Sequence, residues 1–134
     1  MTNDDQIAKV LAAAKTIAVV GLSDKPWRPS YGVSSYMQKQ GYRIIPVNPN
    51  IEASLGEKAY RRLEDMPEEI DIVNIFRKPE HVGAIVDSAI RLGAKCVWMQ
   101  EGVYDHAAAG RAYAAGLTVI ENRCILKYHR NQVA

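Results

Sequence analysis

Residues 16–32 read TIAVVGLSDKPWRPSYG. An almost wholly apolar run ends at Gly21, and a polar loop leads from there to a helix-like stretch. An apolar run without polar alternation is typical of a strand that is buried on both faces of a sheet. Ser30 is a good N-cap residue and Gly41 a good helix stop, so we expect a helix over residues 30–40. A strand, a loop and a helix in this order are where nucleotide-binding folds hold phosphates.

The same alternation continues along the whole chain. Strands are expected at residues 16–21, 42–47, 71–76, 95–99 and 117–120. Helices are expected after the capping residue Asn3 and at residues 30–40, 79–92 and 107–115. Pro46 suits a position near the end of its strand or a strand at the edge of the sheet. Residues 51–67 predict only a loop with a helical turn around Arg61 to Asp65. The pattern predicts an α/β fold with three layers: a doubly wound, parallel five-stranded sheet with helices on both faces.

Length and composition narrow the class of protein. The 134 residues suit a single domain spanning residues 1–134. Seventeen basic and fifteen acidic residues nearly balance, which argues against wholesale binding to nucleic acid or to an anionic membrane. The chain has no signal-peptide pattern and no apolar run near the roughly 20 residues that span a bilayer. Cys96 and Cys124 form no CxxC motif, and the three histidines lack ligand spacing. We therefore expect a soluble cytoplasmic protein without a metal site.

Polar segments follow all five expected strands. They are GLSDK at residues 21–25, NPN at 48–50, RKP at 77–79, QEG at 100–102 and NRC at 122–124. In an open α/β sheet, ligands bind beyond the carboxyl ends of the strands, near the switch in strand order. Three of these segments carry cations, which favours an anionic ligand at this edge.

The first of these segments is the most informative. Gly21 lets the chain turn off the strand and approach a ligand closely. Ser23 and the backbone amides around it can donate to phosphate oxygens, and the helix that Ser30 opens favours an anion at its N-terminus. Lys25 and Arg28 add positive charge.

Two common nucleotide sites do not match this loop. An NAD site requires GxGxxG here and an acidic residue at the end of the second strand, but the chain has Gly21-x-Ser23 and the turn Val47-Asn48-Pro49. NAD is therefore disfavoured. The P-loop pattern GxxxxGK[ST] is absent, which excludes that class.

Five segments together resemble a known family. They are IAVVGLSDKPWRPSY, GYRIIPVNPN, VNIFRKPEHV, VWMQEGV and ENRC, in family order from about Thr16 to Cys124. They are similar to the CoA-binding domain, as in the N-terminal domain of succinyl-CoA synthetase alpha subunits and ADP-forming acyl-CoA synthetases. The chain looks closest to small stand-alone bacterial proteins of this family. The resemblance implies a Rossmann-like fold with coenzyme A across the carboxyl edge of the sheet.

The resemblance also implies roles for individual residues. Gly21 and Ser23 match the loop that meets the CoA phosphates, and Ser30 matches the small residue opening the helix. The other matches are Val47, Asn48 and Pro49 at the adenosine, Ile75, Phe76, Arg77 and Pro79 along the nucleotide and the pantetheine arm, and Gln100, Glu101 and Gly102 at the fourth strand end. The charge fits as well, since CoA carries a diphosphate and a 3′-phosphate, and the expected rim carries Lys25, Arg28, Arg77 and Lys78.

The chain also departs from the synthetases. The resemblance does not extend to their second domain with its phosphorylated histidine, so it does not imply synthetase activity. Asn122 stands where stand-alone relatives tend to have Asp.

Several alternatives stay open. Phe76 suits either a wall for the ligand or the core of its strand, and Trp27 suits either a cover for the nucleotide or a partner surface. Cys124, beside Arg123, is a candidate for exchange with the CoA thiol. The leading hypothesis is non-catalytic binding of CoA or an acyl-CoA. The alternatives are a partner subunit of an acyl-CoA-handling enzyme and an NAD(H)-binding redox sensor.

Overall fold

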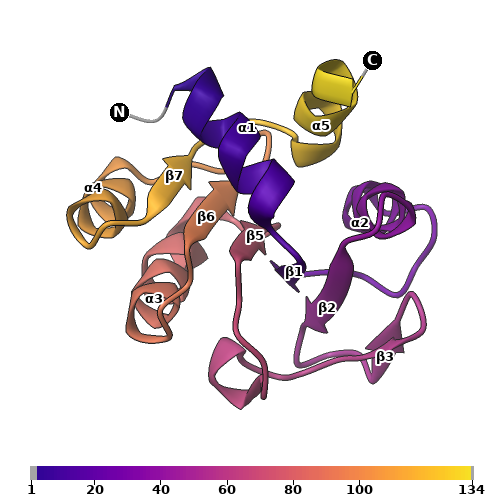
Figure 1. Ribbon diagram of the computed structural model, residues 1–134. Coiled ribbons are helices and arrows are strands. Elements are labelled where there is room, and N and C mark those ends of the chain that lie inside the picture. Colours follow the sequence, from indigo (N-terminus) through magenta and orange to yellow (C-terminus); the bar gives the residue numbers. More distant parts are fainter. Residues whose placement is uncertain (1–2, 134) are drawn as a thin grey trace.

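A five-stranded parallel sheet forms the centre of the computed structural model, which describes residues 3–133 (Figure 1). Its strand order is β2-β1-β5-β6-β7. The strands are β1 (Thr16–Val20), β2 (Arg43–Val47), β5 (Ile72–Ile75), β6 (Cys96–Met99) and β7 (Thr118–Ile120). All four pairings in the sheet are parallel, so the expected α/β fold is confirmed. The strand order reverses between β1 and β5, the place where such sheets bind ligands.

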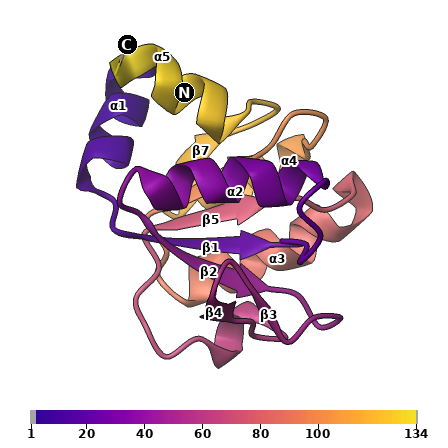
Figure 2. The same ribbon diagram turned by 90° about the vertical axis from the view of Figure 1, so that its right-hand side faces the viewer.

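Helices cover both faces of the sheet, as the strand–helix alternation predicts. On one face lie α1 (Asp4–Ala13), α2 (Pro29–Lys39) and α5 (Ile125–Val133), and on the other lie α3 (Pro79–Arg91) and α4 (His106–Ala114). Figure 2 shows α2 lying along β1, with α1 and α5 side by side beyond it. No helix within residues 3–133 has the length and apolar character needed to span a bilayer.

Alternate residues of each strand point to opposite faces and build two apolar cores. Ala18 and Val73 face α3 and α4, whereas Ile17 and Ile72 face α1, α2 and α5. Trp98 is fully buried in the second core, and its indole N–H donates to the carbonyl of Arg123 at 2.9 Å. Because both faces are buried, the strands lack the polar alternation of an exposed sheet.

The edge position of β2 explains Pro46. Pro46 pairs with Val19 in register, and its carbonyl accepts from the amide of Tyr60 at 2.9 Å on the outer side. Backbone N–H and C=O of one strand residue point the same way, so the missing N–H of Pro46 costs no bond to β1. Pro46 thus meets both predicted conditions, since it lies near the end of its strand and β2 is an edge strand of the sheet.

Three parts of the structure differ from the expectation, and the first is α5, which no expected helix covers. Residues 51–67 hold a small hairpin, β3 (Ala53–Ser54) with β4 (Glu57–Lys58), before the predicted helical turn, which is the short 3₁₀ helix η1 (Leu63–Asp65). The predicted N-cap at Ser30 is wrong, because Arg28 is the N-cap residue and Pro29 the first residue of α2. Proline suits a first helical position, where its missing N–H is not needed.

Candidate functional site

The carboxyl ends of β1 and β5 meet at Gly21. The Gly21 amide donates to the carbonyl of Val47 at 2.9 Å, and the Phe76 amide donates to the carbonyl of Val20 at 2.9 Å. Gly21 has φ +90°, and a Cβ built there would overlap the carbonyl oxygen of Phe76. The sequence predicts close approach by a ligand, but the close neighbour is the backbone of the next strand. Because Gly21 has no side chain, the loop after β1 can pack closely against the loop after β5.

Hydrogen bonds within the loop after β1 fix its shape. The Ser23 amide donates to Ser30 Oγ at 3.0 Å, and the Lys25 amide donates to Ser23 Oγ at 3.0 Å. Ser30 is buried at 6% exposure, so its hydroxyl supports the loop from beneath. Ser23 Oγ, in contrast, is half-buried and retains its own proton to donate.

The turn after β2 is tied to the same loop. Asn48 Nδ2 donates to the carbonyl of Leu22 at 3.1 Å, while its Oδ1 accepts from the Asn50 amide at 2.9 Å. Ser54 of the β3–β4 hairpin donates to the carbonyl of Ser23 at 2.8 Å. These bonds hold the loops of β1 and β2 at one corner of the sheet and leave Pro49 exposed.

A cavity of about 300 Å³, here called the β1–β2 cavity, lies at this corner. It is lined by Val20, Val47, Pro49, Arg61, Arg62, Leu63, Glu64, Arg77, Ala84, Ile85 and Ser88. Its walls are apolar strand ends and the side of α3, and three arginines reach it from two loops. Such a combination suits a ligand with both a flat apolar part and anionic groups.

Two of the three arginines have no carboxylate partner in the described chain. Arg62 pairs with Asp65 at 3.2 Å, whereas neither Arg61 nor Arg77 forms an ion pair within residues 3–133. Sequence reasoning selected Arg77 but missed Arg61 and Arg62, since they lie outside the segments that directly follow strands. Adjacent arginines in a loop after an edge strand were the available signal.

Glu64 is the acidic residue that lines the β1–β2 cavity, and its carboxylate is hydrogen-bonded to side chains of α3. It accepts from Ser88 Oγ at 2.7 Å and from Arg91 at 3.0 Å. The hydrogen bond from Ser88, with the help of Arg91, lowers the pKa of Glu64. Its charge is thus compensated at α3, and the guanidinium groups dominate the cavity.

The other predicted cations surround the corner. Lys25 and Arg28 are exposed in the loop after β1, and Lys78 is the N-cap residue of α3 ahead of Pro79. Lys25 lies 3.8 Å from Asp24, a pair too exposed and too long to remove its charge from the rim. Arg28 and Lys78 form no ion pair within the described residues.

Of the predicted site residues at the end of β5, Ile75 lies in the core and Phe76 at its margin. Ile75 is fully buried, and Phe76 is half-buried and packs on the core beneath α2. Its ring is therefore placed to serve both the core and a ligand wall.

The end of β6 is separate from the β1–β2 cavity. Gln100 is buried at 3% exposure, and its Nε2 donates to Asn74 Oδ1 at 2.7 Å. Glu101 pairs with Lys127 of α5 at 2.9 Å. The Gly102 amide donates to Asn122 Oδ1 at 2.7 Å, and Asn122 has the positive φ of +55° that Asn tolerates better than most residues. These contacts connect the loop after β6 to α5 and to the loop after β7.

The cysteines and possible metal ligands lie elsewhere. Cys96 is fully buried, and burial raises the pKa of its thiol. Cys124 is half-buried beyond β7. Within residues 3–133 no three His, Cys, Asp or Glu side chains gather as a metal site would require.

Comparisons with known proteins give a consistent result. A family model described as CoA binding domain matches residues 15–130. The chain is 42% identical over 124 residues to a Bacillus subtilis (strain 168) protein named Uncharacterized protein YneT, covering 92% of each. It superposes with a TM-score of 0.95 and 38% identity on a hypothetical protein from Pyrococcus horikoshii OT3, covering 99% of this chain and 94% of that one. It is also 28% identical over 102 residues to Acetate--CoA ligase [ADP-forming] II of Archaeoglobus fulgidus, covering 74% of this chain but only 15% of that enzyme.

Proposed function

Because the chain belongs to the CoA binding domain family, we propose that it binds coenzyme A, free or as an acyl-CoA, at the carboxyl edge of its sheet. The observation that carries this proposal is the β1–β2 cavity, where three arginines surround an apolar floor. CoA combines an adenine ring with a 3′-phosphate and a diphosphate, so it needs both kinds of surface.

Each part of CoA has a matching surface. Adenosine lies in the β1–β2 cavity against Val20, Val47 and Pro49, with its 3′-phosphate towards the guanidinium groups of Arg61 and Arg77. The diphosphate lies at the loop of Gly21 and Ser23, near the N-terminus of α2, where the helix dipole favours an anion. Lys25, Arg28 and Lys78 add charge around it.

We further propose that the protein binds this ligand without transforming it. Glu101 is paired with Lys127, and Glu121 is paired with His106 at 3.3 Å. Catalysis by proton transfer or nucleophilic attack needs a reactive group within reach of a base. Gln100, the other polar side chain at the end of β6, is buried on Asn74.

Titration calorimetry with CoA, dephospho-CoA and NAD tests the proposal. CoA should bind, and dephospho-CoA should bind at least about tenfold more weakly, since a charge-assisted phosphate contact contributes roughly 1.5–3 kcal/mol. NAD should bind more weakly than CoA. The proposal is refuted if the folded protein shows no binding of CoA. If dephospho-CoA binds with the same affinity as CoA, the 3′-phosphate has no role in binding.

Two arginine variants locate the site. Arg61→Ala and Arg77→Ala should each weaken CoA binding roughly tenfold or more. Arg130→Ala on α5 removes the same charge from a helix that does not line the β1–β2 cavity, so it should change affinity less than about twofold. Equal losses in all three variants would point to net charge instead of a site.

A second candidate is a subunit that handles acyl-CoA together with another chain. The likeness to an ADP-forming acetate–CoA ligase favours it, since this chain spans about a seventh of that enzyme. Co-purification with a partner, followed by an assay of acyl-CoA turnover, distinguishes a subunit from a stand-alone binding protein. Fluorescence of NADH on mixing tests the third alternative, an NAD(H)-binding redox sensor.

A further inference from the structure

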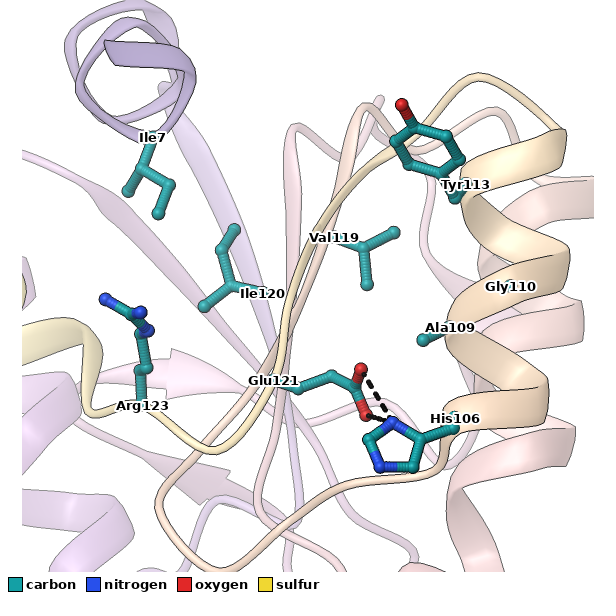
Figure 3. A pocket seen from close by; sticks show the side chains of 9 residues that line it. All are labelled: Ile7, His106, Ala109, Gly110, Tyr113, Val119, Ile120, Glu121 and Arg123. Carbon is teal, nitrogen blue, oxygen red and sulfur yellow. Dashed lines mark hydrogen bonds and ion pairs between the residues drawn. The ribbon is translucent and has the colours of Figure 1, made fainter. Parts of the chain in front are cut away.

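A second cavity lies at the opposite edge of the sheet, along the edge strand β7 between α1 and α4 (Figure 3). This cavity, here called the β7 groove, has a volume of about 430 Å³. It is lined by Ile7, His106, Ala109, Gly110, Tyr113, Val119, Ile120, Glu121 and Arg123. It shares no lining residue with the β1–β2 cavity, so the proposed nucleotide site does not explain it.

The β7 groove has an apolar body and one polar end. Ile7, Val119 and Ile120 line its body, while Glu121 and His106 form an ion pair towards the carboxyl end of β7 (Figure 3). Arg123 reaches the groove from just beyond the strand. The polar end therefore lies at the same edge of the sheet as the proposed CoA site.

We propose that the β7 groove holds the acyl group of an acyl-CoA whose nucleotide occupies the β1–β2 cavity. This inference rests on the proposed function and specifies its ligand as a thioester with an aliphatic chain. The apolar body takes the chain, and the polar end meets the amide groups and the thioester of the arm that carries it.

The two cavities are a suitable distance apart. From β1 across β5 and β6 to β7 are three strand spacings, or about 14 Å. The pantetheine arm has the backbone length of about four extended residues, which is also roughly 14 Å. A nucleotide held at β1 thus delivers its thioester to β7.

Arg123 provides a donor for the polar end. Its carbonyl is held by the indole of Trp98 at 2.9 Å, which fixes the backbone at this position. Its guanidinium lies 5.8 Å from the ring centre of Tyr128 and forms no ion pair within residues 3–133. Glu121 accepts from the Asp105 amide at 3.2 Å, so the opposing acceptor is fixed as well. A carbonyl and an amide N–H of the arm fit this pair of partners.

Gly110 keeps the groove open on the side of α4. It lies within the helix and is exposed, and a Cβ built there would meet no atom within 4 Å. Glycine inside a helix destabilises it by roughly 1 kcal/mol relative to alanine. No neighbour in the described structure requires glycine here, and the bare helix surface at Gly110 leaves room for an acyl chain to lie against it.

The test compares CoA with acetyl-, butyryl- and hexanoyl-CoA by calorimetry. In the natural protein, affinity should rise with chain length, up to roughly fourfold for each CH₂ that becomes buried. Gly110→Leu fills the groove, so it should abolish this rise and change the affinity for CoA itself less than about twofold. Ala114→Leu is the matched control, because Ala114 is exposed on α4 and does not line the groove, and it should keep the rise.

Each outcome decides between the two proposals. If CoA binds but affinity is independent of chain length, the groove is not an acyl site, and the proposed function stands. If neither CoA nor any acyl-CoA binds, the proposed function fails and this inference fails with it. If Gly110→Leu instead shifts a monomer–dimer equilibrium in sedimentation while acyl length has no effect, the groove is an interface between copies and the inference is overturned. The chain-length series in the natural protein keeps the test valid should a variant fold poorly.

Discussion

Gly21 sits between two strand ends, and the space for a side chain there is taken by the carbonyl group of Phe76. The glycine has the positive φ expected of a sharp exit from a strand, but it also sets how closely two loops approach. Sequence reasoning found the position and its backbone freedom. It had no means to identify the neighbour, because Phe76 lies 55 residues further along the chain.

Replacing Gly21 should therefore be costly. Gly21→Ala should lower the free energy of unfolding by about 3 kcal/mol or more, since a left-handed conformation costs roughly 1–2 kcal/mol and steric overlap adds to it. Gly93→Ala is the control, because Gly93 has φ +73° and open space around a Cβ, so only about 1 kcal/mol should be lost. Urea unfolding measures both losses. Equal losses would show that the backbone at Phe76 moves aside without cost and would contradict the prediction.

Asp71, which directly precedes β5, accepts hydrogen bonds from the backbone at the start of β1. Its Oδ2 accepts from the amides of Lys15 and Thr16 at 2.7 and 3.0 Å, and Lys95 pairs with it at 3.2 Å. Burial alone would raise its pKa, but these hydrogen bonds and Lys95 outweigh it and lower the pKa below 3.8. The contribution of Asp71 is thus present above that pH and is lost as the pH falls through its folded-state pKa.

Asp71→Asn should destabilise the protein by roughly 1–3 kcal/mol at neutral pH. The difference from the natural protein should shrink below about pH 4, where the carboxylate becomes protonated. Glu69→Gln, at an exposed position without an ion pair in the described chain, should have little effect. Urea midpoints at pH 7 and pH 3.5 provide the check, and a difference that does not change with pH contradicts the assigned role.

At the scale of elements, α5 is packed onto α1 and α2 by aromatic residues. His129 is 8% exposed, its Nδ1 lies 3.0 Å from the hydroxyl of Tyr36, and the rings of Tyr36 and Tyr42 meet it edge-on. Tyr128 donates to Asp4 of α1, and burial followed by that hydrogen bond raises its pKa to about 12. The expected helices do not include α5, because Lys127 and Arg130 on its outer side conceal the apolar pattern of its inner side.

The packing of α5 should depend on pH. Burial lowers the pKa of His129 below 6.5, so its contribution is present above that pH and is lost as the pH falls through the lower folded-state value. Urea unfolding between pH 7.5 and 5 should show this loss in the natural protein and not in His129→Gln. His81→Gln, at an exposed position on α3, should keep the natural profile. Identical pH profiles for the natural protein and His129→Gln would exclude the effect.

The β3–β4 hairpin shows why some elements escape prediction. Its turn places Leu55 at φ +54° and Gly56 at φ +76°, a position where Asn or Gly would be the usual signal. Leu55 is kept there by packing on the core beneath α2 and by Gln38, which donates to its carbonyl at 2.9 Å. Tertiary contacts decide this turn. The strands of the sheet, in contrast, carry their own apolar pattern.

For the whole molecule, the order of strands and helices correctly predicts that the polar segments after the strands lie at one edge of the sheet. It does not predict how their side chains are arranged there. Alternating strands and helices predict which loops share an edge, because parallel strands all end on the same side. They do not predict which loop residues turn inwards. Gln100 was selected and is buried on Asn74, while Arg61 and Arg62 were missed and line the β1–β2 cavity.

Ligand binding at that edge should stabilise the entire fold. A ligand that binds only the native state adds about 2.7 kcal/mol at a concentration of 100 Kd. CoA should therefore raise the Tm by on the order of 10 °C, and Arg77→Ala should need a higher CoA concentration for the same rise. Thermal unfolding at several CoA concentrations measures this. A Tm that is independent of CoA contradicts it.

The contact of α1 with the last strand has a consequence for synthesis. Ile7 and Ile120 line the same groove but are 113 residues apart, so a ribosome needs roughly 6–20 s to translate the stretch between them. During that interval the apolar side of α1 lacks the part of its cover that β7 supplies, and only the earlier strands and α2 can shield it.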